Sequence, residues 1–251
     1  MKILGIESSG LVASVAVLEE GIIQGEFTTN FKKTHSQTLL PMLDILKDTL
    51  ELDLDTVDAI AVAAGPGSFT GLRIGSATAK GVALAMDKPI IAVPTLEAMA
   101  CNFYGSDKLI CPIMDARRNQ VFTGLYRFEN DDLDIVMDQC PLDINELLDK
   151  INQLLGDGES AETDLGQIKE VVFLGDGVNV QRQTIEDNCK VKYSFAPAHL
   201  AYQSASSLCV RAVTYYNEGK AINSDDFRPE YLRVSQAERE RTKKLAAEGG
   251  N

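Results

Sequence analysis

The segment 65–97 constrains the fold more strongly than any other part of the chain. It opens with Gly-Pro-Gly, a turn sequence, because glycine reaches positive φ without strain and proline fixes its own φ. Ser68 or Thr70 can then cap a helix that the pattern predicts over Phe69–Met86. A buried strand precedes this helix and the strand PIIAV follows it, so the segment predicts a helix that packs on its own sheet.

The predicted helix has almost no polar face, since its only charges are Arg73 and Lys80 and many of its residues are small. Small side chains let backbones approach closely, so we expect the helix to pack on two sides, against its own sheet and against a neighbouring domain or another protein. At 3.6 residues per turn its two faces are Leu72, Gly75, Ala79, Ala83 and Met86, and Ile74, Thr78, Gly81 and Ala85. The residues that we expect at the association surface are Phe69, Leu72, Arg73, Gly75, Ser76, Ala79, Lys80 and Ala83.

The charge balance argues against nucleic-acid binding by this chain alone. Its 251 residues include 24 Lys and Arg against 37 Asp and Glu, a formal net charge of −13. Phosphate backbones are gripped by basic patches, so we expect contact with nucleic acid only within an assembly.

The cysteines and the N-terminus indicate a protein of the reducing cytoplasm. The five cysteines are odd in number, widely spaced and without a C-x-x-C pair, so neither a disulfide framework nor a thiolate zinc site is expected. The N-terminus enters a strand at once, and no apolar run approaches the ~20 residues of a membrane span. We therefore expect no signal peptide, no membrane association and a cytoplasmic location.

The order of elements predicts an α/β fold with two similar halves. In the first half, the predicted strands and helices are Lys2–Glu7, Leu11–Leu18, Ile22–Thr28, helix Thr34–Leu50, Val57–Ala64, helix Phe69–Met86, Pro89–Val93 and helix Thr95–Ala100. In the second half they are Leu109–Asp115, Gln120–Phe128, Leu133–Asp138, helix Asn145–Leu155, Val171–Leu174, helix Asn179–Asn188, Val191–Phe195 and helix Leu200–Glu218. A duplicated βββαβαβα order is typical of two ribonuclease-H-like domains of the actin, sugar-kinase and heat-shock ATPase (ASKHA) superfamily.

The expected domains are 1–105, joined by the segment 219–233, and 106–218. An acidic loop is expected at 156–166 and a charged, solvated or disordered tail at 234–251.

In that superfamily the turn between the first two strands faces phosphate and magnesium. Glu7, Ser8 and Ser9 occupy it here and form a possible, degenerate anion turn. The corresponding turn of the second half, Met114–Asn119 (MDARRN), lacks the glycine that lets a backbone approach a phosphate. The paired phosphate clamp of an ATPase is therefore incomplete, which argues against autonomous catalysis.

Other catalytic constellations are not supported. The only histidines, His35 and His199, have no partner at i+4, so no metal site is expected from them. We assign His35 a capping or surface role, and His199 the start of the last helix. The chain has no G-x-S-x-G elbow for a hydrolase triad. Gly175-Asp176-Gly177 resembles a ligand-facing turn, but one short glycine turn is more often a tight turn.

Several segments together resemble the bacterial TsaB (YeaZ) family. They are MKILGIESS (1–9), HSQTLLP (35–41), GPGSFTGLRIGSATAK (65–80), PTLE (94–97), MDARRN (114–119) and PEYLR (229–233). The match runs in order over residues 1–233, and GPGSFTGLR and DARR are its most specific parts. One departure is Glu7, where the family is expected to have aspartate.

The resemblance implies a two-domain ASKHA fold and a part in making threonylcarbamoyladenosine beside the tRNA anticodon. It implies a non-catalytic platform, without cofactor or metal, that pairs with and activates the catalytic paralogue TsaD and recruits the ATPase TsaE. tRNA would be reached only through the complex. Where the paralogue has two metal-binding histidines, this chain has Thr95 and Met99, which cannot replace them.

Alternatives stay open at this point. An ASKHA-type small-molecule kinase or ATPase is the first and a peptidase the second. The sequence also does not say whether the isolated chain forms a homodimer or whether a nucleotide binds at the partner interface.

Overall fold

The computed structural model describes residues 1–31, 34–156, 165 and 168–233. Most of the expected acidic loop at 156–166 and all of the expected tail at 234–251 lie outside these residues. The strands are β1 (Lys2–Glu7), β2 (Ala13–Glu19), β3 (Ile22–Thr29), β4 (Ala59–Gly65), β5 (Ile90–Pro94), β6 (Leu109–Asp115), β7 (Gln120–Glu129), β8 (Asp132–Asp143), β9 (Glu170–Leu174) and β10 (Lys192–Phe195). The helices are α1 (His35–Thr49), α2 (Phe69–Met86), α3 (Thr95–Ala100), α4 (Ile144–Leu155), α5 (Gly177–Asn188) and α6 (Ala205–Asn217), with short 3₁₀ turns at Leu54–Thr56 and Cys101–Phe103.

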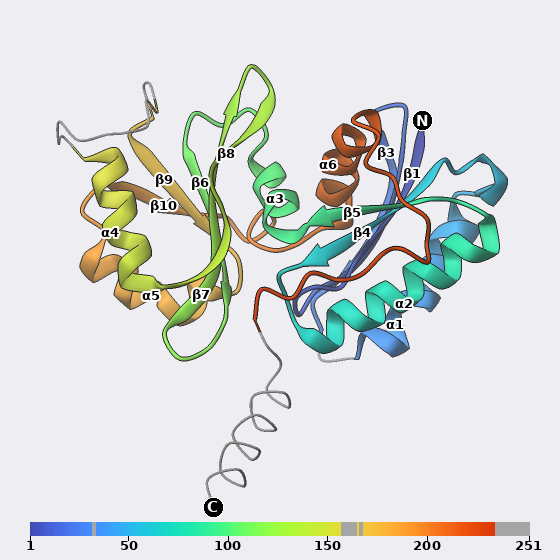
Figure 1. The fold of residues 1–251 in the computed structure, drawn as a ribbon, viewed down its shortest axis with the longest axis horizontal. Coiled ribbons are helices and arrows are strands. Elements are labelled where there is room, and N and C mark those ends of the chain that lie inside the picture. Colours follow the sequence, from blue (N-terminus) through green and yellow to red (C-terminus); the bar gives the residue numbers. More distant parts are fainter. Residues whose placement is uncertain (32–33, 157–164, 166–167, 234–251) are drawn as a thin grey trace, which may run out of the picture.

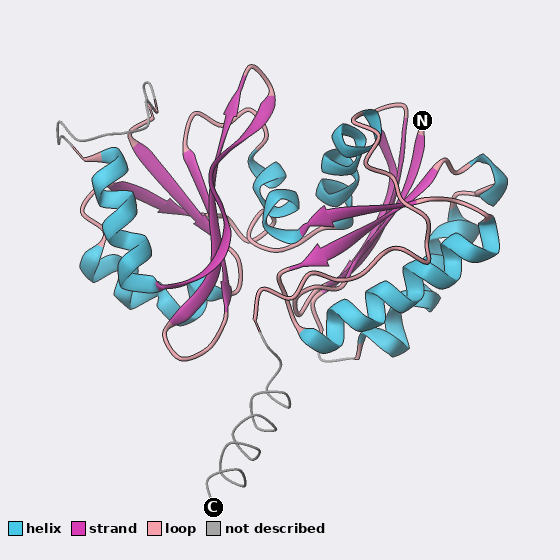
Figure 2. Ribbon diagram, viewed as in Figure 1, coloured by secondary structure: helices cyan, strands magenta, loops and turns pink. Residues whose placement is uncertain are grey.

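The first sheet has the order β3-β2-β1-β4-β5. Strand β1 pairs antiparallel with β2 and parallel with β4. Strand β4, AIAVAAG, is buried along its whole length, because helices cover both faces of the sheet. Helices α1 and α2 lie on one face, and α3 and α6 on the other (Figure 2).

The second sheet repeats this arrangement, with the order β10-β9-β6-β7-β8. Its first strand in sequence, β6, is antiparallel to β7 and parallel to β9, as β1 is to β2 and β4. The predicted duplication of βββαβαβα is therefore confirmed, and the fold is a pair of ribonuclease-H-like α/β units (Figure 1).

Helix α3 fills the space between the two sheets. Leu96 and Met99 on α3 pack with Ile110, Met114 and Tyr126 of the second sheet in one buried cluster. The neighbouring Glu97 is buried as well, so α3 joins the two halves through its side chains.

The last helix differs from the prediction at its start. We expected it over Leu200–Glu218, with His199 at its beginning, but α6 begins at Ala205. Ser204 before it is extended, with φ −140° and ψ 147°, and the side chain of Asn102 donates hydrogen bonds of 2.9 Å to the carbonyls of Leu200 and Tyr202, which hold the preceding residues in a non-helical course. Strand β8 likewise runs further, to Asp143, than the predicted end at Asp138.

Helix α6 also packs on a different sheet from the one its place in the sequence suggests. We grouped it with residues 106–218, but Leu208, Cys209 and Ala212 are buried against the first sheet. Gly5 on β1 makes this approach possible, because a Cβ there would lie 2.5 Å from the Cys209 sulfur. The division of the chain at residue 105 stays a prediction, and α6 is the element that crosses it.

Candidate functional site

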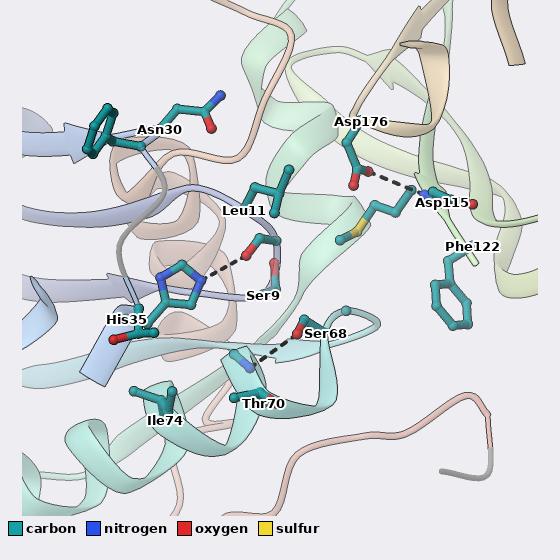
Figure 3. Close-up of a pocket in the computed structure, with 16 residues that line it drawn as sticks. Ser9, Leu11, Asn30, His35, Ser68, Thr70, Ile74, Asp115, Phe122 and Asp176 are labelled. Atoms are coloured by element: carbon teal, nitrogen blue, oxygen red, sulfur yellow. Dashed lines mark hydrogen bonds between the residues drawn. The ribbon is translucent and has the colours of Figure 1, made fainter. Parts of the chain in front are cut away.

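A cavity of about 510 Å³ opens between the two halves (Figure 3). The β1–β2 turn, the start of α1 and the start of α2 form one wall. The ends of β6 and β9 and the side chain of Phe122 form the other. Its lining residues are Ser9, Gly10, Leu11, Asn30, Phe31, Thr34, His35, Gly67, Ser68, Thr70, Gly71, Ile74, Met114, Asp115, Phe122 and Asp176.

The polar groups of the predicted anion turn already form hydrogen bonds within the protein. One carboxylate oxygen of Glu7 accepts from both the backbone N–H and the hydroxyl of Ser9, each at 2.6 Å. The Ser8 hydroxyl donates to the carbonyl of Gly71 at 2.9 Å. Glu7, Ser8 and Ser9 are all buried, so the groups with which an anion would bond are turned into the protein.

Two glycines of α2 let this helix pack directly against the β1–β2 turn. Ser68 caps the helix, accepting from the Gly71 N–H at 3.3 Å, as the sequence allowed. A Cβ at Gly71 would lie closer than 3.0 Å to the Ser8 carbonyl oxygen, and one at Gly75 equally close to the Ser8 hydroxyl. The small residues of α2 thus serve contact with the β1–β2 turn of the same chain.

Burial changes the acidity of Glu7. Desolvation raises the pKa of its carboxyl to about 7, against the opposing effect of the hydrogen bonds from Ser9. The second carboxylate oxygen has no partner among the described residues. A carboxyl in this state is a poor ligand for magnesium, which requires an ionised, accessible oxygen.

The opposite wall of the cavity is acidic. The backbone N–H of Asp115 donates to the carboxylate of Asp176 at 3.3 Å, and Figure 3 shows both residues across the cavity from His35. Burial, and to a smaller extent the charge of Asp115, raises the pKa of Asp176. Asp115 and Asp176 are the charged side chains on this wall among the described residues that line the cavity.

One sequence interpretation needs correction here. His35 does not cap or cover the surface, because its Nε2 hydrogen-bonds to the Gly10 carbonyl at 2.9 Å inside the cavity. Asp176, in the Gly-Asp-Gly motif whose role the sequence left open, lines the same cavity. No local pattern could have joined these residues, since they meet only when the two halves fold together.

Thr95 and Met99 lie away from the cavity lining. Both are buried, and Met99 belongs to the apolar cluster between the sheets. Among the residues that the structure describes, no group of three or more His, Cys, Asp or Glu could hold a metal ion.

The structure decides which face of α2 points inward. Most of the expected association residues are buried within the chain itself: Leu72, Gly75, Ser76, Ala79 and Ala83. Of the expected set, only Phe69, Arg73 and Lys80 reach the surface. The first face named above is therefore the core face, because it packs on the β1–β2 turn and the first sheet.

The outer surface of α1 and α2 exposes several large apolar side chains. Leu84 on α2 is 73% exposed, and Leu40 and Ile45 on α1 are 57% and 51% exposed. Between the helices lies a groove with a cavity of about 220 Å³, lined mainly by Leu40, Leu43, Leu46, Leu52, Val82, Ala85 and Met86, with Asp44 and Lys47 beside them. Exposed apolar surfaces of this kind mark interaction sites.

No helix within the described ranges is both long and apolar enough to cross a membrane.

A family model described as TsaD, tRNA N6-adenosine threonylcarbamoyltransferase, matches residues 23–241.

Full-length relatives give the narrower assignment. The Bacillus subtilis tRNA threonylcarbamoyladenosine biosynthesis protein TsaB is 34% identical over 95% of this chain and 96% of its own length. The Escherichia coli protein of the same name is 29% identical over 94% of this chain and 96% of its own length.

Among solved structures, a Pseudomonas aeruginosa protein with similarity to peptidase YEAZ superposes with a TM-score of 0.73. It is 26% identical over 92% of this chain and 99% of that chain. The chain therefore belongs to the TsaB (YeaZ) family, whose curated members are named for the biosynthesis of threonylcarbamoyladenosine on tRNA.

Proposed function

We propose that this chain is the non-catalytic platform subunit of a complex that makes threonylcarbamoyladenosine beside the tRNA anticodon. In this role it pairs with and activates a TsaD-type catalytic paralogue and recruits a TsaE-type ATPase. Family membership supports the pathway, since the curated relatives carry its name. tRNA modification itself is assigned to the paralogue.

The observation that carries the platform role is the apolar outer surface of α1 and α2. Leu40, Ile45 and Leu84 expose large side chains there, and Arg73 and Lys80 remain the only charges on α2. Burial of such a surface stabilises a complex by about 25 cal/mol per Å² of apolar area. We place the paralogue on this surface, and a second copy of this chain there when the paralogue is absent.

The experiment is Leu84→Arg, tested for co-elution with the paralogue in size-exclusion chromatography. We expect the complex to be lost while the melting temperature stays within a degree or two of wild type, because Leu84 contributes little to the core. Val180→Arg on α5 is the matched control, since Val180 is 60% exposed on the other half. Wild-type pairing by Leu84→Arg would contradict the placement.

The alternative, a small-molecule kinase or ATPase of the same superfamily, is disfavoured by the closed β1–β2 turn and the acidic wall of the cavity. We expect the isolated protein to show no ATP hydrolysis above background. Steady-state turnover that disappears in Glu7→Ala, with folding intact, would revive this alternative.

A further inference from the structure

The last described segment of the chain, residues 227–233, contacts both halves of the molecule. Residues 227–233 leave the first half at the buried Phe227, and the Glu230 N–H donates to the carbonyl of Ala64 at 2.7 Å. Gly65 is required at this crossing: its φ is +121°, and a Cβ there would overlap the Glu230 carbonyl oxygen. The segment therefore follows a fixed course across the end of β4.

Its continuation brings arginines from distant segments to one surface. Tyr231 stacks on Phe69, with ring centroids 4.7 Å apart, and its hydroxyl accepts from Arg73 Nε at 3.4 Å. Two residues later, Arg233 donates to the carbonyl of Ala116 in the second half. Figure 1 shows this segment in red, passing from beside α2 toward β7.

Ala116 begins the β6–β7 turn, where the backbone is strained. Arg117, Arg118 and Asn119 have φ values of 63°, 58° and 61°, a left-handed conformation that residues with a side chain rarely adopt in succession. Both arginines are exposed. Within the described part of the chain, neither they nor Arg73 form a salt bridge.

This concentration of positive charge stands out in a chain with a net charge of −13. Two carboxylates lie beside it. Asp115 is engaged by the N–H of Arg117 at 2.7 Å, and Glu230 by the side chain of Gln139 at 3.3 Å. The side chains of Arg73, Arg117 and Arg118 are exposed, and none of the three forms a salt bridge with a described carboxylate.

We propose that this surface binds a single-stranded segment of RNA, with phosphates on the arginines and one base against Tyr231. We call it the arginine patch: Arg73, Arg117, Arg118 and Tyr231, with Arg233 anchoring the segment on the Ala116 carbonyl. Guanidinium groups bond phosphate oxygens in pairs, and bases of unpaired RNA stack on aromatic rings. Tyr231 is 39% exposed, and its ring stacks on the ring of Phe69 with an angle of 11° between the planes. Because the chain as a whole carries a net charge of −13, the patch would also orient the RNA.

The inference rests on the proposed function, because the RNA would be the tRNA substrate of the complex. The test therefore uses the complex with the paralogue and an unmodified tRNA transcript as the probe, with binding measured by fluorescence anisotropy at several salt concentrations. The variant is Arg117→Asn with Arg118→Asn, since asparagine removes the charge and tolerates the left-handed conformation. Lys150→Ala on α4 with Lys190→Ala just after α5 removes equal charge from another part of the second half and is the control.

We expect the arginine variant to bind tRNA about tenfold more weakly and to lower the slope of log K against log salt by about 1.4 to 1.8. The lysine control should match wild type in both. Unchanged affinity and slope in the arginine variant would overturn the inference. So would a wild-type complex that forms but does not bind tRNA, and this result would leave the platform role standing. If the arginine variant no longer pairs with the paralogue, the patch is a protein interface and the inference is wrong.

Discussion

The contact between α2 and the β1–β2 turn can be tested by two glycine-to-alanine changes on one helix. A Cβ at Gly71 would meet the Ser8 carbonyl oxygen closer than 3.0 Å, and this backbone atom cannot move without shifting the turn. Gly81, ten residues along the same helix, has nothing within 4 Å of a built Cβ. Comparing Gly71→Ala with Gly81→Ala therefore separates the steric cost of the added methyl group from its effect on helix propensity.

The magnitudes follow from general costs. Overpacking against backbone costs about 3 kcal/mol, the upper end of the usual range, and alanine returns about 1 kcal/mol of helix propensity. We expect Gly71→Ala to lose about 2 kcal/mol and Gly81→Ala to gain up to about 1 kcal/mol. For a chain of this size the corresponding shifts are about 4–8 °C downward and 2–4 °C upward in melting temperature.

The measurement is urea and thermal unfolding followed by circular dichroism, with the m-value checked for constancy. Gly71→Ala should be less stable than wild type, and Gly81→Ala at least as stable, in both urea and thermal unfolding. If Gly71→Ala is as stable as Gly81→Ala, the close approach of α2 to Ser8 is not a constraint on this fold, and the account of the closed turn fails.

Three further results are expected. Because the pKa of Glu7 is raised from 4.5 to about 7, its contribution to stability is full below pH 4.5 and is lost as the pH rises to about 7, so wild type should lose more stability over this range than Glu7→Gln does. Arg211 donates to the buried carboxylate of Glu97 at 2.6 and 2.7 Å, so Arg211→Met should cost about 3 kcal/mol and the double variant with Glu97→Leu should recover most of it in a double-mutant cycle. Ser204 caps α6, and Ser204→Ala should cost about 1 kcal/mol in urea unfolding; no change would show that the cap bond is not needed.

Much of the fold could be predicted from local patterns. The bounds of β1 and α2 agree with the predicted Lys2–Glu7 and Phe69–Met86, because the apolar run of one and the glycine turn before the other are written in adjacent residues. The repeated order of elements gave the duplicated architecture for the same reason. The family followed from motifs that are contiguous in sequence.

The start of α6 was missed because a distant side chain decides it. Residues 200–204 could continue a helix as far as their own pattern shows, but hydrogen bonds from Asn102 to the carbonyls of Leu200 and Tyr202 help to hold them in another conformation. The helix then packs beside Gly5, two hundred residues earlier. The helix propensity of residues 200–204 does not reveal partners such as Asn102 and Gly5, which are distant in sequence.

The sequence by itself determined that α2 is a helix with two apolar faces, and it could not choose between them. Only the tertiary structure decided that Gly75 and Ala79 face inward, that His35 and Asp176 share a cavity, and that Arg233 reaches Ala116. Periodicity is fixed by hydrogen bonds three to four residues apart, whereas these contacts join segments that meet only after both sheets have packed around α3.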